Sequence, residues 1–148
     1  MMNTMNISGK ITLTILLALP FTMHAQQEIE GYWLTQEGNS IVEIYKNSDD
    51  KYLGKIVWLK EPNDKKGNAL TDKMNKDKSL RGRSVMGMHV LEDLEYAKGV
   101  WNGSIYAAKK GRTFSVTLSM DTQDELLVKV SVMGMSRVQN WTRTDWPK

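Results

Sequence analysis

Few side chains in this sequence have the types and spacing needed for catalysis or metal binding. Cysteine is absent, and the histidines are His24 and His89. Without cysteine the chain has no disulfide, no thiolate metal ligand and no thiol nucleophile. A histidine that works as a general base or metal ligand needs partners, and neither an H-x-H nor an H-E-x-x-H spacing occurs around His89. We therefore expect no catalytic residue, no metal site and no cofactor.

The remaining motifs give the same indication. The serines have no G-x-S-x-G context, and neither a P-loop nor a G-x-G-x-x-G sequence is present. Asp49 and Asp50 are adjacent, as are Glu92 and Asp93 at the expected end of a strand. Neighbouring residues point to opposite faces of a strand, so such a pair cannot share one site. These patterns favour binding over catalysis.

The clearest concentration of charge is Lys60–Arg83. It holds eight basic and four acidic residues, a local charge of +4, whereas the whole chain carries +3. A connection this long is usually functional or mobile. A solvated, lysine-rich excursion is the simpler interpretation, with an anion site as the alternative, and Asp72–Leu80 could form a short helix. Arg81 and Arg83 are better candidates for specific contacts than the lysines, because a guanidinium offers a rigid fork of donors.

The elements that must position these residues are short strands. Apolar and hydroxyl residues alternate in Arg112–Met120, and Glu125–Met133 places leucine and valine on one face. The polar residues between these runs indicate a turn, so the two runs predict a β-hairpin. Six further runs have strand character. They are Tyr32–Thr35, Ile41–Lys46, Tyr52–Leu59, Ser84–Leu91, Val100–Ala107 and Val138–Thr144.

About eight strands with frequent turn signals, and no convincing amphipathic helix, predict an all-β antiparallel sandwich or barrel. Eight strands close a barrel that is either filled by side chains or wide enough for one small ligand. Several of the residues expected to face inward are large, which favours a filled interior. They are Val42, Ile44, Ile56, Trp58, Trp101, Ile105, Phe114, Val116, Leu118, Leu126, Val128 and Val130.

Met1–Ala25 has the features of a secretory signal peptide. Lys10 supplies the positive charge, and the apolar run Ile11–Met23 has 13 residues, too few for the ~20 that a bilayer span needs. Cleavage after Ala25 would leave Gln26–Lys148, a single domain of 123 residues with a net charge of +2. We expect an exported protein, periplasmic or secreted, that does not span a membrane after cleavage.

Several short motifs follow one another in a particular order. They are Gly31–Thr35 (GYWLT), Ile41–Tyr45 (IVEIY), Gly54–Leu59 (GKIVWL), Leu80–Arg83 (LRGR), Val85–Gly87 (VMG), Trp101–Gly103 (WNG), Gly111–Phe114 (GRTF) and Gln139–Arg143 (QNWTR). This ordered set resembles the bacterial exported family called domain of unknown function 2147, over essentially the whole mature chain. Two positions depart from that family's pattern. The stretch from Asn75 to Asp77 lacks a proline, and Ala107 and Ala108 replace an Asp-Pro.

The resemblance implies a small secreted or periplasmic β-barrel related to the lipocalin and fatty-acid-binding group. In that group a Gly-x-Trp on the first strand closes one end of the barrel, and an arginine near the last strand packs over the indole. Gly31, Trp33 and Arg143 match these positions, so the resemblance gives them a structural role in barrel closure. The fold we expect is an eight-stranded, antiparallel, up-and-down barrel with one long basic loop.

Three functions are compatible with these features. The first is a non-enzymatic barrel that binds a small apolar or amphipathic ligand and no nucleic acid. The second is an envelope protein-interaction or inhibitor domain that acts through Lys60–Arg83. The third, which the scarcity of catalytic residues disfavours, is an enzyme at the barrel mouth that uses Arg81, Arg83, His89 and a carboxylate. The ligand-binding candidates are Trp58, Arg81, Arg83, His89, Trp101 and Tyr106.

Overall fold

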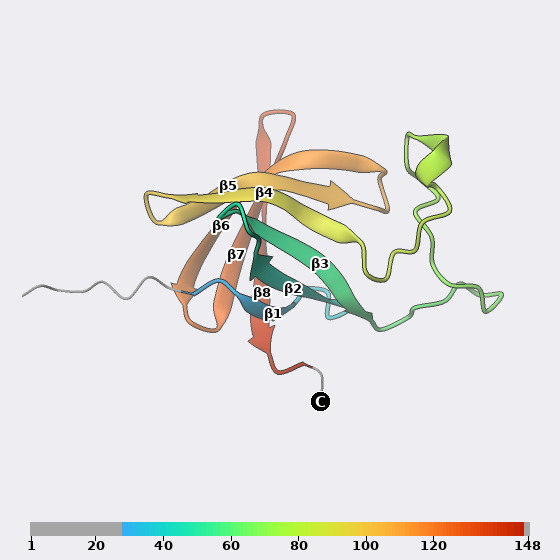
Figure 1. Cartoon of the computed structure of the whole chain (residues 1–148), viewed down its shortest axis with the longest axis horizontal. Helices are drawn as coiled ribbons and strands as arrows, with labels where there is room; N and C mark the ends of the chain where they lie inside the picture. The colour runs from blue at the N-terminus through green and yellow to red at the C-terminus, as the bar shows by residue number, and fades with distance from the viewer. Residues whose placement is uncertain (1–27, 147–148) are drawn as a thin grey trace, which may run out of the picture.

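A computed structural model describes residues 28–146 as an all-β structure with a single short 3-10 helix (Figure 1). The predicted signal segment, Met1–Ala25, lies outside the described residues. No helix among residues 28–146 is long and apolar enough to cross a bilayer. The elements are β1 (Gly31–Leu34), β2 (Ser40–Lys46), β3 (Tyr52–Leu59), η1 (Lys78–Leu80), β4 (His89–Ala97), β5 (Val100–Ala107), β6 (Arg112–Thr122), β7 (Glu125–Val132) and β8 (Met135–Thr144).

The eight strands form one closed barrel. Each strand pairs antiparallel with the next in sequence, and β8 returns to pair with β1, where Trp33 lies opposite Arg143. The predicted hairpin is present, since Val116 of β6 lies opposite Val130 of β7. The eight-stranded up-and-down barrel predicted from the sequence is therefore confirmed, and it closes over the short register between β1 and residues 142–144 of β8.

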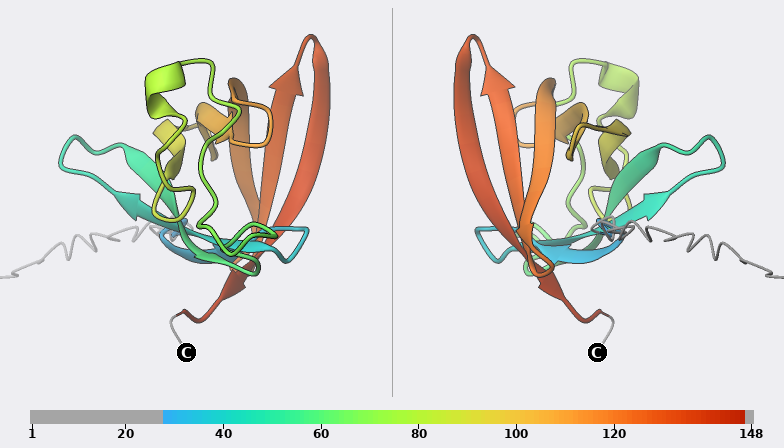
Figure 2. Two further views of the ribbon diagram at one scale, coloured as in Figure 1. Left: turned by 90° about the vertical axis from the view of Figure 1, so that its right-hand side faces the viewer. Right: turned by 90° about the vertical axis from the view of Figure 1, so that its left-hand side faces the viewer.

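The connections between strands alternate between the two ends of the barrel. One end, called here the mouth end, carries residues 35–39, 60–88, 108–111 and 133–134; residues 60–88 are called the long connection. The opposite, closed end carries the other turns, residues 28–30 before β1 and residues 145–146 after β8. In the left view of Figure 2 the long connection runs across the face of the barrel that is turned to the viewer.

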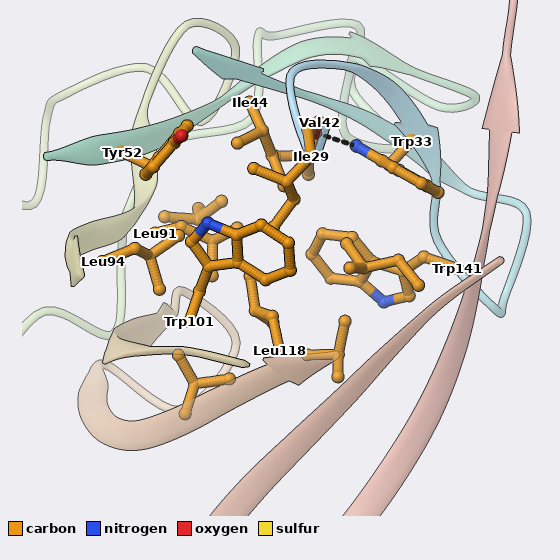
Figure 3. Packing of buried hydrophobic residues seen from close by; sticks show 14 of the residues in the cluster. Ile29, Trp33, Val42, Ile44, Tyr52, Leu91, Leu94, Trp101, Leu118 and Trp141 are labelled. Atoms are coloured by element: carbon orange, nitrogen blue, oxygen red, sulfur yellow. Dashed lines mark hydrogen bonds between the residues drawn. The ribbon is translucent and has the colours of Figure 1, made fainter. Parts of the chain in front are cut away.

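The closed half of the barrel is filled by side chains. Three tryptophans, Trp33, Trp101 and Trp141, are buried and pack with aliphatic residues from neighbouring strands (Figure 3). The Trp101 ring makes an edge contact with Tyr52, at 6.3 Å between centroids. Close packing of this kind supplies most of the favourable free energy of folding in a chain without disulfides. The aliphatic members of this core include Ile29, Val42, Ile44, Leu91, Leu94, Val116, Leu118, Leu126 and Val128.

A tryptophan and an arginine cover the closed end. The Arg143 guanidinium carbon lies 4.3 Å from the centre of the Trp33 ring, and the indole Nε1 donates to the carbonyl of Ile29 at 2.9 Å. The guanidinium also donates to three backbone carbonyls, at 2.7 to 2.8 Å. Gly31 has a φ of +128°, and a Cβ there would lie 2.7 Å from Arg143 Nη1. Glycine at this position leaves room for the arginine.

A β-bulge turns one predicted inward residue out of the barrel. Ile41 pairs with Trp58 whereas Val42 pairs with Ile56, so Val57 is an extra residue in β3. Beyond the bulge Trp58 faces outward, and its ring lies 6.2 Å from that of Trp146. The prediction that Trp58 faces inward is therefore wrong.

The fourth strand begins later than predicted. Ser84 forms an isolated bridge with Thr71, a bend and a turn follow, and β4 starts at His89, so the predicted strand Ser84–Leu91 is wrong over its first five residues. Glu92 and Asp93 lie in the middle of β4, at a second bulge, and not at a strand end. A Cβ on the opposite glycine, Gly103, would lie 2.7 Å from the Glu92 carbonyl oxygen, so the bulge fits only against a glycine.

Candidate ligand-binding cavity at the mouth end of the barrel

The mouth half of the barrel contains a cavity of about 720 Å³, called here the mouth cavity. Its wall includes Ile56 and Leu59 from β3, Val90 from β4 and Ala108 from the β5–β6 turn. Leu59 reaches the interior because the bulge at Val57 shifts the alternation of β3 by one residue. The barrel is thus packed in one half and hollow in the other, which the large inward residues of the sequence did not predict.

The long connection contributes a second wall to the mouth cavity. Leu70, Met74 and Val85 of this connection line the cavity, and Val85 also packs against the core. Polar side chains lie around the apolar wall. One rim pair, Lys109 and Glu37, brings nitrogen and oxygen to 3.7 Å. The polar lining residues are Thr35, Glu37, Asn39, Ser40, Lys60, Glu61, Thr71, Lys73, Tyr106, Lys109 and Gln139.

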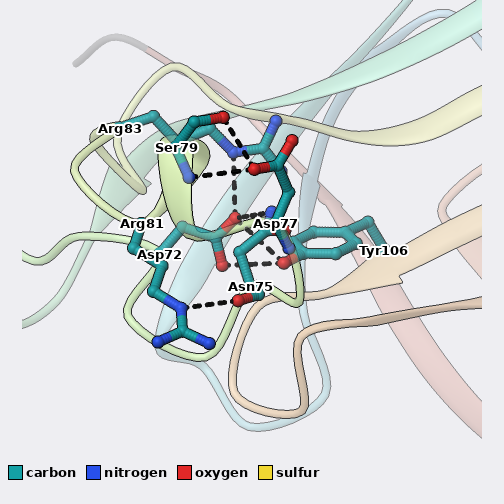
Figure 4. A network of polar contacts seen from close by, with 7 residues as sticks. All are labelled: Asp72, Asn75, Asp77, Ser79, Arg81, Arg83 and Tyr106. Atoms are coloured by element: carbon teal, nitrogen blue, oxygen red, sulfur yellow. Dashed lines mark hydrogen bonds and ion pairs between the residues drawn. The ribbon is translucent and has the colours of Figure 1, made fainter.

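A buried carboxylate holds the long connection in place. The Asp72 side chain is 0% exposed and accepts hydrogen bonds from Asn75 Nδ2 at 2.7 Å and Arg83 Nε at 2.9 Å. The Tyr106 hydroxyl donates to both of its oxygens, at 2.8 and 2.9 Å (Figure 4). Tyr106 belongs to β5, so this contact ties the connection to the barrel wall. Each acceptor oxygen has a partner, which a buried charge requires.

The pKa values of the two groups agree with this geometry. Burial alone raises the pKa of Asp72, but the hydrogen bonds from Asn75, Tyr106 and Arg83 outweigh it, and the pKa lies below its ordinary value. Burial and the Asp72 carboxylate raise the pKa of Tyr106. Asp72 is therefore ionised and Tyr106 is a neutral donor at neutral pH, which is the pairing that this network needs.

Two further contacts fix the same part of the long connection. Arg81 Nε donates to the Asn75 carbonyl at 2.7 Å. Gly111 has a φ of +59°, and a Cβ there would overlap the carbonyl group of Met74. Glycine in the β5–β6 turn therefore lets the connection pass directly over the barrel rim. The predicted helix Asp72–Leu80 is reduced to η1, Lys78–Leu80, because these tertiary contacts shape the preceding residues.

A second cavity, of about 520 Å³, lies where the long connection meets β4, β5 and β6; it is called here the outer groove. Its lining is polar and holds more basic than acidic side chains. His89 is exposed, and its Nε2 is hydrogen-bonded to the Tyr45 hydroxyl at 2.7 Å. The lining residues are Asn75, Lys76, Arg83, His89, Glu92, Tyr106, Gly111, Arg112 and Thr113.

The structure brings together only some of the residues that the sequence singled out. Arg83, His89 and Tyr106 line the outer groove, and Tyr106 also lines the mouth cavity. Arg81 braces the long connection through its bond to Asn75. Neither cavity is lined by Trp58, which lies on the outer face, or by Trp101, which lies in the packed half.

The residue that sequence reasoning missed is Asp72. In a lysine-rich segment an aspartate is expected to lie in solvent, where it balances the charge of neighbouring lysines. Asn75 three residues later and Arg83 eleven residues later are compatible partners, but its third partner, Tyr106, is 34 residues away. Nothing local in the sequence distinguishes this aspartate from the exposed Asp77 nearby.

Comparison with known proteins agrees with the fold. Residues 31–143 match the family model described as an uncharacterized protein conserved in bacteria (DUF2147). The chain belongs to this family. The resemblance inferred from the ordered motifs is therefore confirmed.

A solved structure gives the wider relationship. The chain is similar to protein HP1028 from the human pathogen Helicobacter pylori, which belongs to the lipocalin family. The TM-score is 0.68 and the identity 26%, over 80% of this chain and 84% of that chain. No curated protein matches the sequence. The barrel is lipocalin-like.

Proposed function

We propose that this protein is an exported, non-enzymatic barrel that binds one small apolar or amphipathic ligand in the mouth cavity. One observation carries the proposal: the mouth half of the barrel is hollow, with apolar walls and a polar rim. Ligand pockets in proteins have volumes of about 300–1,000 Å³ and combine apolar walls with a few polar groups. The similarity to a lipocalin-family structure supports the same use of the fold.

The form of the cavity selects for the chemistry of the ligand. Apolar wall residues such as Leu59, Val85 and Val90 favour a hydrocarbon or aromatic body, because each Å² of apolar surface removed from water contributes about 25 cal/mol. The rim offers lysine and glutamate side chains to a polar end group. An amphipathic molecule fits this arrangement with its polar end toward solvent.

Binding is favoured over catalysis because the acid and base groups near the two cavities already have hydrogen-bond partners within the protein. The Asp72 carboxylate is occupied by Asn75, Arg83 and Tyr106. The His89 Nε2 is occupied by the Tyr45 hydroxyl. A general base needs a free lone pair within reach of its substrate. In both residues the hydrogen bonds within the protein occupy the atoms that would accept the proton, which is typical of a structural role.

Export rests on the sequence of Met1–Ala25, which combines a basic start, an apolar run and a small residue at the cut. The absence of cysteine is compatible with an oxidising compartment, because a barrel of this size folds on its core alone. Fractionation of the host cells and N-terminal sequencing should find the protein outside the cytoplasm and starting at Gln26. A full-length chain in the cytoplasm would contradict this part of the proposal.

Native mass spectrometry of protein purified from its own host tests the binding proposal. We expect an added mass of one small molecule, which organic extraction removes and which chromatography identifies as apolar or amphipathic. Extracted protein should take the molecule up again with a 1:1 ratio. Protein that leaves the host without any added mass, and that takes up no apolar compound after extraction, would overturn the proposal.

A further inference from the structure

The two ends of the barrel carry opposite charge. The four connections at the mouth end hold ten basic and five acidic side chains, a net charge of +5. The described segments at the closed end (28–30, 47–51, 98–99, 123–124 and 145–146) hold two basic and six acidic side chains, a net charge of −4. The small net charge of the whole chain conceals this separation, which orients the molecule in an electric field.

Exposed apolar side chains gather at the same end as the positive charge. Met133 in the β7–β8 turn is 95% exposed, and Met135 and Val138 of β8 are 73% and 54% exposed. Met74, Leu80 and Met86 of the long connection are exposed as well. Among residues 28–146, Tyr96 is the other large hydrophobic side chain that is exposed. Large apolar side chains left in water at the tip of a hairpin are typical of a contact surface.

The apolar residues stand on two separate projections. Both views of Figure 2 show the tip of the β7–β8 hairpin, in red, and η1 of the long connection, in lime green, projecting upward past the barrel. The long connection also lines the mouth cavity, so one of the two projections belongs to a segment that forms part of the proposed ligand site.

We propose that the mouth end docks on the surface of an anionic lipid bilayer, with the β7–β8 tip and the long connection entering the headgroup region. The basic residues are attracted to the negative surface potential of the bilayer, and the methionines enter the boundary between headgroups and acyl chains. A bilayer accepts separate apolar anchors surrounded by lysines. A protein partner would instead need a continuous complementary area of about 800 Å² on this chain.

The docked orientation has a consequence for ligand exchange. The mouth cavity would face the bilayer, so an apolar ligand could pass directly between the cavity and the bilayer without entering the aqueous phase. This consequence rests on the proposed ligand binding, but docking itself does not, because it uses the charge and the exposed side chains alone. Vesicle binding and ligand binding are separate measurements, and either proposal can fail while the other stands.

Flotation with lipid vesicles tests the docking. The purified protein is mixed with vesicles of equal parts phosphatidylglycerol and phosphatidylcholine, or of phosphatidylcholine alone. We expect it to float with the anionic vesicles at least tenfold more than with the neutral ones, and to be released at high salt because exposed charges are screened. Absence of binding to the anionic vesicles would overturn the proposal. It would do so even if the mouth end were then found to bind an acidic protein.

Matched variants locate the contact. Lys65→Glu with Lys66→Glu changes the mouth end, and Lys46→Glu with Lys98→Glu makes the same charge change on the opposite side. We expect the first pair to weaken vesicle binding at least fivefold and the second by less than twofold. Equal effects of the two pairs would contradict an oriented docking.

The apolar anchors have their own test. Met133→Ser with Met135→Ser replaces two exposed side chains that make no contribution to the described core, so thermal unfolding of the barrel should be unchanged. We expect vesicle binding at low salt to fall at least fivefold. Undiminished binding by this folded variant would show that the hairpin tip does not enter the bilayer, and would overturn the proposed orientation.

Discussion

Replacing Asp72 by asparagine should release the long connection while the barrel stays folded. Asparagine has nearly the same shape as aspartate, but it carries no charge and has only one acceptor oxygen. With its oxygen in the place of Oδ2, the neutral amide still faces Asn75 and Arg83, but its nitrogen then replaces the oxygen that accepts from the Tyr106 hydroxyl. The charge-assisted bond from Arg83 Nε at 2.9 Å is therefore lost as an ion pair.

The size of the effect follows from the contacts. A hydrogen bond to a charged group contributes about 1.5–3 kcal/mol. The Arg83 side chain is 39% exposed and regains water when the bond is lost, which places the cost near the lower part of that range, about 2 kcal/mol. Since 1.36 kcal/mol is a factor of ten in an equilibrium constant, the closed form of the connection should lose about 30-fold in population relative to the open one.

Amide hydrogen exchange can detect this opening. The Asp72 amide donates to the Arg83 carbonyl and the Val85 amide to the Leu70 carbonyl, so both should exchange about 30-fold faster in Asp72→Asn if local opening controls their exchange. Amides of the β6–β7 ladder should keep their rates. Asp77→Asn is the control in the same segment, because Asp77 is exposed and its carboxylate accepts hydrogen bonds from Ser79 and not from the Asp72 cluster.

Two results would refute this reasoning. Unchanged exchange at Asp72 and Val85 would mean that the carboxylate does not hold the connection. Equal acceleration throughout the β6–β7 ladder would mean that the cluster stabilises the whole barrel and not the connection.

The remaining predictions concern pH, a turn and the closed end. The pKa of Asp72 is lower in the folded protein than its ordinary value near 4, so its contribution to holding the long connection closed is complete above about pH 4 and is lost as the pH falls below that value. The protection of the amides of the long connection against hydrogen exchange, measured by NMR, should therefore decline below about pH 4. In Asp72→Asn it should show no such decline. Gly111→Ala should lower the free energy of unfolding more than Gly134→Ala, because both glycines have positive φ but a Cβ meets atoms only at the first; equal losses in chemical denaturation would contradict a close approach. Arg143→Ala should cost about 3 kcal/mol, because it removes three hydrogen bonds to carbonyls and the contact with Trp33, and a loss under 1 kcal/mol would show that the closed end does not depend on it.

The barrel could be predicted from the sequence because most strands alternate apolar and polar residues, and this alternation is visible in the sequence itself. Alternation in Arg112–Met120 and Glu125–Met133 marks residues with one buried face, and the structure pairs them as expected. A β-bulge interrupts this alternation. The extra residue Val57 places Trp58 on the outer face, and the bulge at Glu92 and Asp93 makes the sequence pattern predict the end of a strand where the structure has the middle of β4.

The candidate site could be predicted only in part, because its walls come from distant segments. Val85 begins the VMG motif and Ala108 stands where the family pattern has a proline, but neither motif position indicates a cavity wall, and the two residues meet there only in the fold. The burial of Asp72 depends on Tyr106 and on the close approach at Gly111, which are tertiary contacts. Composition correctly indicated that Lys60–Arg83 is basic, but it could not show that this segment is pinned to the barrel and covers its cavity.

The central claim, that the mouth cavity takes an apolar ligand, is tested most directly by titration with the neutral fluorescent probe N-phenyl-1-naphthylamine in the absence of vesicles. Ala108→Trp places an indole in the cavity wall, whereas Ala97→Trp places one on an exposed residue at the other end of the barrel. We predict saturable binding by the unmodified protein and by Ala97→Trp, and at least tenfold weaker binding by Ala108→Trp. Equal binding by all three proteins, or no binding by the unmodified protein, would contradict the claim.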